Sequence, residues 1–449
     1  MRLCVSGADI RITPLTFAIM ATATRTSGPA ATLSPVLTAQ FRVVAVFTPD
    51  TMIVVEAMLL ANGFKDAARL ATAIVSVFEM CAVVVDSRAR RGLRAAVGVV
   101  TRAAALRRSG RAATEAAAVA AALPASLDGC LDADSMRAVH RLIELALGLK
   151  VPTDATSFGA DAASASVEDE AAMKAACGSA GDLTPFPAFD SAVRAVADAA
   201  ENGRGVIITG DCGSGKSAIV RCAGEYIGAR HAGGTTRGPV RVVSHWLMPR
   251  ALTPAEVYGA VNEANENEWH TGIVPMLIGG ASDESSGRCW IILDGQVDGA
   301  SCDELCSIAD PSHRLSLANS QRITVPHSVA VVIEALTLEG ASPSLCARFP
   351  LVHVPAALVP ADARNSCWLR RAARAYHLSE SAVARLGTCL NGVLPDVAAF
   401  VDGPECARFR RASTEFAGQS LLRALEAVIK ECAAAAAGAL ADAHSTCAD

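Results

Sequence analysis

A phosphate-binding loop is the feature that most constrains this chain. Residues 206–217 read VIITGDCGSGKS: an apolar β-branched run, then a glycine, four residues and Gly-Lys-Ser. The pattern G-x-x-x-x-G-K-[ST] between a strand and a helix is that of the nucleotide-binding P-loop. Its glycines let the backbone curl so that several N–H groups point at one phosphate cluster. The sequence therefore predicts an α/β fold with a nucleotide site.

The residues of the loop have distinct expected parts in that chemistry. Lys216 is expected to reach the β- and γ-phosphates, and the Ser217 hydroxyl to ligate Mg²⁺. ATP and Mg²⁺ are therefore the expected ligands. The residues expected at the nucleotide are Gly210, Asp211, Cys212, Gly213, Ser214, Gly215, Lys216, Ser217, Asp294 and Glu334.

A second element follows the P-loop. Residues 290–294 read WIILD, an apolar strand that ends in a carboxylate. In P-loop proteins such an Asp holds Mg²⁺, which makes Asp294 the expected partner of Ser217; the plain alternative is a turn or helix-capping Asp. ATPases of the AAA+ type usually place a catalytic Glu next, but here Gly295 follows, and it cannot take a proton. Asp298 lies nearby, on an expected turn that would aim it elsewhere. The site should therefore bind nucleotide and turn it over poorly or not at all.

Composition limits the other classes of function. The chain has 449 residues and a net charge of −5, from 45 acidic and 40 basic residues, so no global basic field favours nucleic acid. Its 15 cysteines form no C-x-x-C pair or zinc-type spacing, which favours a reducing, intracellular compartment. The apolar stretch 15–23 only faintly resembles a signal peptide. No apolar run approaches the length of a membrane span. We expect no nucleic acid and no membrane as partners.

The pattern along the chain divides it into zones. Two short β-like runs, Phe17–Met20 and Val43–Phe47, precede a helical zone over 51–150. Residues 151–183 are small, acidic and rich in Gly, Ser and Ala, which predicts a linker. Strands and helices alternate over 184–360, and 361–449 is helical with an alanine-rich tail. The expected strands are Gly205–Thr209, Val240–Ser244, Trp290–Leu293, Val329–Glu334 and Leu351–Val354.

The stretch 246–354 resembles the second AAA+ module of dynein heavy chains. The matching residues are Pro249, Tyr258-Gly259, Glu268-Trp269, Gly272, Asp294-Gly295, Val297-Asp298, Asn319, Arg322, Glu334 and the segment Ala341 to Arg348. The stretch 36–106 resembles the end of the first module. Its matching residues are Phe41-Arg42, Val44-Ala45, Pro49-Asp50, Glu56, Met58-Leu59, Gly63-Phe64, Leu70-Ala71 and Gly92-Leu93-Arg94.

This resemblance implies an architecture and partners. In that family, six AAA+ modules in one chain form a ring that moves towards the minus ends of microtubules. Residues 1–50 would be a remnant of the first module's large subdomain and 51–150 its helical small subdomain. Residues 184–360 would be the P-loop large subdomain of the second module, and 361–449 the start of its small subdomain. The resemblance implies other AAA+ modules as partners, and intermediate chains, light chains and microtubules through the full motor. It implies a cytoplasmic, cytoskeletal location, and Ala341-Ser342-Pro343, which resembles the axonemal relatives, adds a ciliary or flagellar axoneme as an alternative.

The resemblance also implies roles for two arginines. Arg94 corresponds to the arginine that contacts nucleotide in the first module's site. Arg348 corresponds to the finger that the second module offers to that same site. The alternative for each is a helix-face arginine in a salt bridge.

Several departures keep other hypotheses open. The chain carries no P-loop or Asp-ended strand for the first module, and it reads Met20-Ala21-Thr22 where the family has Met-Asn-Pro. Thr271 replaces an Asp, and Asp211 replaces the P-loop Pro. A gene fragment, a degenerate copy and one piece of a split motor fit equally. The competing functions are an independent P-loop NTPase, with Asp298 or Glu334 as its base, and a non-enzymatic scaffold with a vestigial loop.

Overall fold

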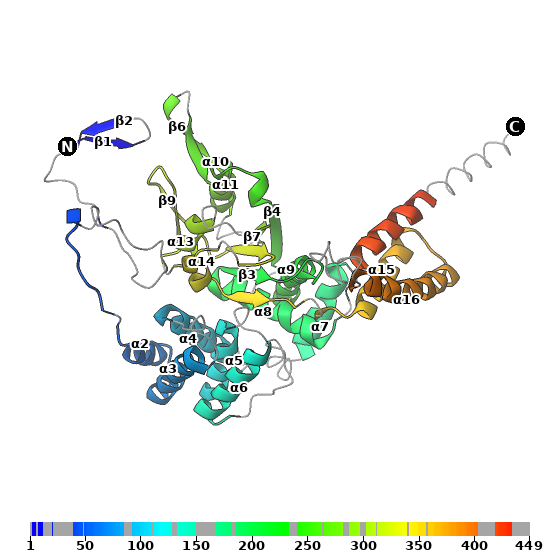
Figure 1. Ribbon diagram of the computed structural model, residues 1–449, viewed down its shortest axis with the longest axis horizontal. Coiled ribbons are helices and arrows are strands. Elements are labelled where there is room, and N and C mark those ends of the chain that lie inside the picture. The colour runs from blue at the N-terminus through cyan, green and yellow to red at the C-terminus, as the bar shows by residue number, and fades with distance from the viewer. Residues whose placement is uncertain are drawn as a thin grey trace. The chain divides into compact units, whose positions relative to one another are not determined.

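The computed structural model divides the chain into two units, Met1–Pro49 and Asp50–Asp449 (Figure 1). The structure describes residues 2–5, 8–11, 20, 39–47, 49–84, 92–108, 112–127, 133–149, 167–181, 183, 185–232, 240–262, 265–281, 287–296, 302–310, 312–338, 341–355, 358–402 and 418–432.

The first unit contains one antiparallel hairpin, in which β1 (Arg2–Val5) pairs with β2 (Ala8–Arg11). The prediction of a strand at Val43–Phe47 is wrong, because these residues have no strand conformation. Val46 and Phe47 are 90% and 88% exposed. Apolar β-branched residues favour a strand only where a neighbouring strand and a buried face receive them. Of the run predicted at Phe17–Met20, only Met20 is described; it is not in a strand, and the rest lies outside the described residues.

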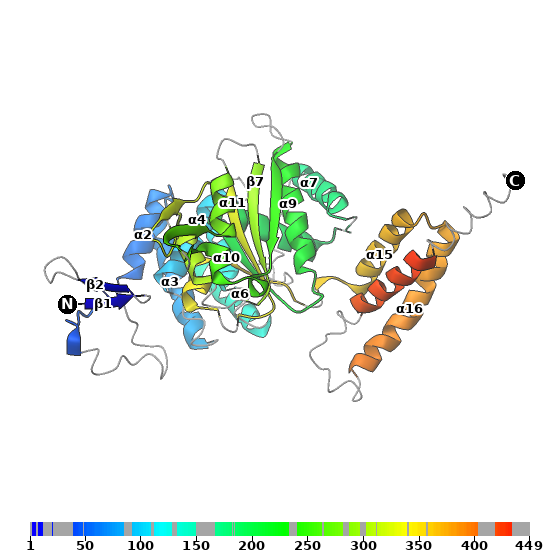
Figure 2. The same cartoon turned by 90° about the horizontal axis from the view of Figure 1, so that it is seen from above.

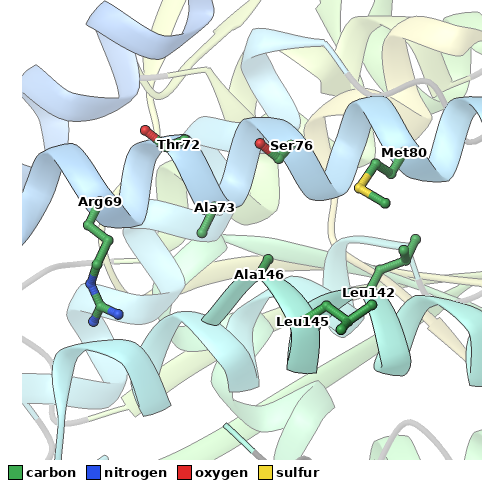
Figure 3. Close-up of a pocket in the computed structure, with 8 residues that line it drawn as sticks. All are labelled: Arg69, Thr72, Ala73, Ser76, Met80, Leu142, Leu145 and Ala146. Atoms are coloured by element: carbon green, nitrogen blue, oxygen red, sulfur yellow. The ribbon is translucent and has the colours of Figure 1, made fainter. Parts of the chain in front are cut away.

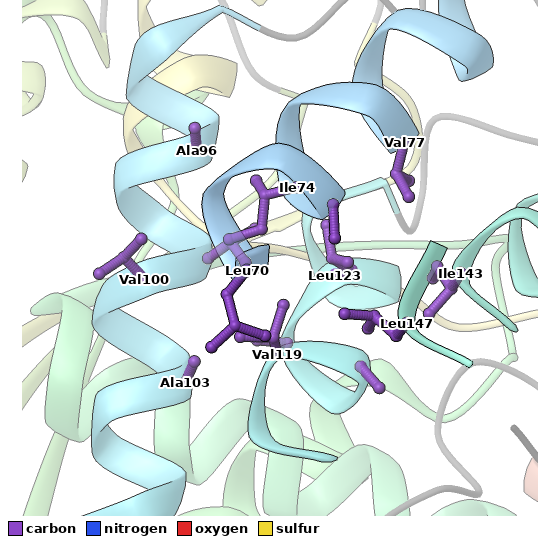
Figure 4. Close-up of a cluster of buried hydrophobic side chains, with 14 of the residues drawn as sticks. Leu70, Ile74, Val77, Ala96, Val100, Ala103, Val119, Leu123, Ile143 and Leu147 are labelled. Atoms are coloured by element: carbon purple, nitrogen blue, oxygen red, sulfur yellow. The ribbon is translucent and has the colours of Figure 1, made fainter. Parts of the chain in front are cut away.

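The helical zone predicted over 51–150 is confirmed. It comprises α2 (Thr51–Ala61), α3 (Ala67–Val84), α4 (Leu93–Arg108), α5 (Glu115–Leu127) and α6 (Ala133–Leu147). The side chain of Asp50 begins α2 by accepting a hydrogen bond from the Met52 N–H at 2.9 Å, as an N-cap should. Side chains such as Leu70, Ile74 and Leu123 are fully buried between the helices (Figure 4). Their spacing of three or four residues brings one face of each helix to this core.

A five-stranded parallel sheet forms the centre of the α/β part. Its order is β11-β3-β10-β7-β4, with every pair parallel. The strands are β3 (Gly205–Thr209), β4 (Arg241–Leu247), β7 (Gly287–Asp294), β10 (Val329–Ala335) and β11 (Leu351–His353). All five predicted strands are thus present, with ends that differ by a few residues. The P-loop strand β3 lies between β11 and β10, and β7 lies beside β10.

Helices cover both faces of this sheet (Figure 2). Val206 and Ile208 of β3 pack with α8 (Pro187–Gly203) and α9 (Lys216–Ala232) in one core. Ile207, between them in sequence, packs in a second core with α11 (Ile273–Gly280) and α14 (Pro343–Arg348). Alternate side chains of a strand point to opposite faces, so a continuous apolar run serves both cores. This three-layer arrangement leaves the carboxyl ends of the strands free to carry a site.

The linker predicted over 151–183 needs correction in its second half. Residues Val167–Ser179 form helix α7, and Met173 and Cys177 are each 1% exposed in the core with α8 and α9. Tyr226 of α9 donates a hydrogen bond to Asp169 of α7 at 2.6 Å. Alanine, glutamate and methionine are good helix formers, and an apolar face gives this helix a docking surface. Residues 167–179 therefore belong to the packed α/β part.

Smaller elements complete the described chain. They are η4 (Pro249–Ala251), α10 (Pro254–Tyr258), β5 (Gly259–Asn262), β6 (Asn265–Thr271), η5 (Asp303–Leu305), α13 (Cys306–Ala309), β8 (Arg314–Ser316), β9 (Arg322–Thr324), α15 (Ala361–Ala375) and α16 (Glu380–Asp402). Residues 418–432 are also helical, and Leu422 packs against Trp368 of α15 and Leu390 of α16. Within the described residues, no helix has the length and apolar character to cross a membrane.

Candidate functional site: the P-loop and its neighbours

The P-loop joins the end of β3 to the start of α9. Gly210, Gly213 and Gly215 have φ values of +150°, +86° and +97°, which residues with a Cβ rarely adopt. The backbone is therefore curled as the glycine spacing predicts. α9 begins at Lys216, so the partial positive charge of its N-terminus faces the loop.

Lys216 closes back onto the loop. Its side chain is 9% exposed, and its ammonium donates to the carbonyl oxygens of Gly210 at 2.6 Å and Asp211 at 2.8 Å. These bonds hold a single buried positive charge over the loop. A phosphate anion is the natural partner for such a charge, because it adds a charge–charge attraction that a neutral carbonyl oxygen lacks.

Two carboxylates lie at the ends of neighbouring strands, and one of them contacts Ser217. Glu334 of β10 stands opposite Asp294 of β7 in the sheet register, and its Oε1 accepts a hydrogen bond from the Ser217 hydroxyl at 2.7 Å. Burial raises the pKa of Glu334 above its usual value, and Asp294 acts in the same direction. The Ser217 hydrogen bond and the charge of Lys216 oppose that rise. Glu334 thus links Ser217 on one side to Asp294 on the other, and the role of the three residues towards Mg²⁺ stays a prediction.

Gly295 follows Asp294 in a conformation that residues with a side chain rarely adopt. Its φ is +151°, and its N–H donates to the carbonyl oxygen of Glu334 at 2.9 Å. The nearest atom to an added Cβ would be Pro249 Cδ at 3.8 Å, so there is space for a side chain. The constraint is the backbone, which departs from the extended form here. The position after Asp294 therefore has no side chain that could take a proton, and its backbone conformation is one that residues with a Cβ rarely adopt.

Two buried polar atoms indicate that the site fits a metal–phosphate group. Ser214 is completely buried, and its Oγ has no hydrogen-bond partner among the described residues. The second carboxylate oxygen of Glu334, Oε2, is also buried and has no hydrogen-bond partner among the described residues. Buried polar atoms normally have partners. Within the described residues, no group of three or more His, Cys, Asp or Glu is placed to hold a metal ion by itself, but Mg²⁺ needs only one or two carboxylates beside phosphate and water.

The two arginines meet at one carboxylate. Arg348, at the end of α14, donates from Nε to Asp310 Oδ1 at 2.9 Å. Arg94, at the start of α4, places Nη2 3.8 Å from the same oxygen. The resemblance implies a shared site for these arginines, and the structure does bring them together. Both also form the salt bridge that the alternative interpretation expects, so their role towards a nucleotide stays a prediction.

Asp310→Asn should lower the free energy of unfolding by about 1 kcal/mol, because the Arg348 bond is charge-assisted but Asp310 remains partly exposed. Arg94→Gln should change it by less than about 0.5 kcal/mol, since that pair is longer and half exposed. Urea denaturation at low and high salt would check both. Equal effects of the two substitutions would contradict this ranking.

Sequence reasoning missed two contacts with the loop and its strand. Gln419, in the helical segment 418–432, donates from Nε2 to the Gly213 carbonyl oxygen at 3.0 Å. His353 Nδ1 of β11 lies 3.3 Å from the hydroxyl of Thr209, at the end of β3. Burial lowers the pKa of His353. The register of β11 beside β3 could have suggested His353, whereas Gln419 had no signal in the sequence. Asp298 lies outside the described residues.

A separate hollow of about 400 Å³ lies between α3 and α6, and its lining includes Arg69, Thr72, Ser76 and Met80 of α3 and Leu142 and Leu145 of α6 (Figure 3). Its lining includes no residue of the P-loop. Leu145 is 79% exposed and Met80 44%, so the hollow is a surface groove. It has no part in the candidate site.

Comparison with known proteins adds a family to this geometry. A family model described as the hydrolytic ATP binding site of the dynein motor region matches residues 2–217. Dynein axonemal heavy chain 6 of Homo sapiens is 25% identical over 323 residues, which make up 71% of this chain and 8% of that relative. The cytoplasmic dynein heavy chain of Paramecium tetraurelia is 27% identical over 324 residues, or 70% of this chain and 7% of that relative. The dynein gamma chain of the flagellar outer arm of Chlamydomonas reinhardtii is 29% identical over 178 residues, or 37% of this chain and 4% of that relative.

The chain spans less than a tenth of the length of the relatives that it matches. The family-model match covers the helical zone over 51–150, strand β3 and the P-loop. With that fold and loop, the matches support an AAA segment similar to those of dynein heavy chains.

Proposed function

We propose that the P-loop of this segment binds Mg-ATP as a structural or regulatory ligand, with little or no hydrolysis. Gly295 carries this proposal, because it has no carboxylate to activate water beside Asp294, the proposed metal ligand, and its φ of +151° is strained for any other residue. Lys216 would pair with the β- and γ-phosphates, and the N–H groups of the loop would surround them. Ser217 and Asp294 would hold Mg²⁺, which neutralises phosphate charge when bound.

Glu334 has a positioning role in this proposal. Its hydrogen bond to the Ser217 hydroxyl holds the side chain that must turn towards the metal. Glu334 is 5% exposed and stands next to Asp294, so a divalent cation would relieve the repulsion between the two carboxylates. ATP bound without a divalent cation would leave the repulsion between these two carboxylates in place. This favours Mg-ATP over free ATP.

Titration calorimetry and phosphate release by the full chain would test the proposal. We expect saturable binding of Mg-ATP, weaker binding of ATP in EDTA, and no phosphate release above background. Robust turnover would contradict the structural role. Absence of binding would favour the vestigial scaffold.

Gly295→Glu should not restore hydrolysis. A Glu at a φ of +151° is strained, so we expect a loss of about 1–3 kcal/mol in the free energy of unfolding and phosphate release no faster than in the wild type. Gly295→Ala should cost a similar amount, because the strain lies in the backbone and not in a steric contact. Thermal melting and phosphate release would check both. A large gain of turnover in Gly295→Glu would show that the backbone adapts and that only the side chain was missing.

One observation favours a second function, an independent P-loop NTPase. Glu334 is a buried carboxylate within hydrogen-bond distance of the P-loop Ser217, so it is the best-placed base in the described residues. This second function is favoured if the chain hydrolyses ATP and if Glu334→Gln stops phosphate release but keeps Mg-ATP binding.

The wider role rests on the relatives, two of which are named as axonemal or flagellar and one as cytoplasmic. We propose that the segment works within a minus-end-directed microtubule motor, next to other AAA+ modules of a ring. Intermediate chains, light chains and microtubules would be reached through the full motor. A cytoskeletal location, in the cytoplasm or in an axoneme, follows from the same proposal.

Within that ring we propose the domain assignments of the sequence analysis: 1–50 and 51–150 as parts of a first module, and 184–360 and 361–449 as parts of a second. Arg94 and Arg348 would then serve a site between modules. In that role Asp310 would release them to a phosphate group.

A further inference from the structure

We propose that Gln419 is a positioning residue that orients the P-loop for phosphate and couples nucleotide binding to the helical segment 418–432. The inference rests on the proposed nucleotide site and extends it to a residue 206 positions from Gly213 in the chain. The direct observation is the hydrogen bond from Gln419 Nε2 to the carbonyl oxygen of Gly213 at 3.0 Å. A carbonyl oxygen can only accept, so the side-chain amide is the donor.

Through the peptide group between Gly213 and Ser214, this contact fixes the orientation of the loop. A trans peptide is planar, so its C=O and N–H point in opposite directions. The C=O points to Gln419, and the Ser214 N–H donates to the carbonyl oxygen of Asp211 at 3.2 Å. Asp211 also accepts from the Lys216 ammonium at 2.8 Å. The Ser214 N–H therefore lies on the same side of the loop as the Lys216 ammonium, where a phosphate would bind.

Gly213 makes this orientation easy to lose. A glycine at a φ of +86° can also adopt many other conformations, so the adjacent peptide could rotate and turn its carbonyl towards the phosphate. An oxygen lone pair facing a phosphate is repulsive, whereas an N–H is a ligand. Gln419 opposes that rotation from outside the loop. It thus preorganises an anion site without touching the anion.

The other side of Gln419 is anchored in a separate core. Three residues along the same helix, Leu422 is 4% exposed and packs against Trp368 and Leu390. Coupling between two equilibria is reciprocal, so a helix that favours the phosphate-ready loop must be stabilised by phosphate in return. Nucleotide binding should therefore reduce the opening of segment 418–432.

Gln419→Met tests this in the full chain, because methionine is similar in length, uncharged and without a donor. Its Kd for Mg-ADP, measured by calorimetry, should rise about two- to tenfold, the range for one neutral hydrogen bond. Ser420→Ala, at the exposed neighbouring position, is the matched control and should bind as the wild type does. Melting without nucleotide should agree among all three proteins.

Hydrogen exchange of residues 418–432 gives a readout that needs no substitution. In the wild type and Ser420→Ala, saturating Mg-ADP should slow exchange there, and in Gln419→Met it should not. A wild type that binds Mg-ADP without that protection overturns the inference and leaves the nucleotide site intact. So does a Gln419→Met protein with wild-type affinity. A wild type that does not bind at all overturns both proposals.

Discussion

Lys216→Ala is expected to abolish nucleotide-dependent stabilisation of this chain. Hydrogen bonds to the carbonyl oxygens of Gly210 and Asp211 place the charged Lys216 ammonium over the loop backbone. A ligand at a hundred times its Kd adds about 2.7 kcal/mol to the free energy of unfolding. The wild type should therefore melt at a clearly higher temperature with Mg-ATP than without it. The variant should melt at the same temperature in both conditions.

Lys174→Ala supplies the control for that experiment. Lys174 is an exposed lysine of α7, and its removal should leave the Mg-ATP shift unchanged. A shift that survives in Lys216→Ala would place the nucleotide elsewhere, or would mean that the loop amides alone bind it. Loss of the shift in both variants would point to a general effect of charge.

The parts of the structure that follow from local sequence were predictable. Five apolar β-branched runs became the five strands of the sheet, because strands buried on both faces need continuous apolar residues. The P-loop followed from glycine spacing, since positive φ values are easily reached only by glycine. Asp294 and Glu334 end two of these runs, and parallel neighbours bring such ends together.

The parts that depend on tertiary context were not predictable in the same way. Val43–Phe47 has strand composition but is exposed and unpaired within the described residues, whereas residues 167–179 look like a linker by composition and form a packed helix. In both cases the deciding factor is what the rest of the chain offers as a neighbour. The meeting of Arg94 and Arg348 at Asp310, and of Gln419 with Gly213, requires contacts across long stretches of chain. No local pattern encodes those pairs.

Gly210→Ala should damage stability and the nucleotide site together. Gly210 has a φ of +150°, and an added Cβ would lie 2.1 Å from the carbonyl oxygen of Val354. Val354 cannot move freely, because its N–H donates to the Thr209 carbonyl oxygen at 2.7 Å and so ties the end of β11 to the end of β3. Backbone strain and forced repacking together should lower the free energy of unfolding by about 2–5 kcal/mol. Urea denaturation would measure this, and any folded fraction should bind Mg-ATP weakly because the strand ends must separate.

Gly279→Ala separates this effect from the mere loss of a glycine. Gly279 lies in α11 with no atom within 4 Å of an added Cβ, so alanine there should be neutral or stabilise the helix by up to about 1 kcal/mol. The two substitutions add the same methyl group, one against a tied carbonyl and one into open space. If Gly210→Ala proved as mild as Gly279→Ala, the contact between the P-loop and β11 would be loose, and the preorganisation argued for the loop would lose its support. A severe effect confined to Gly210→Ala would show that the sheet itself holds the first residue of the loop in its phosphate-binding conformation.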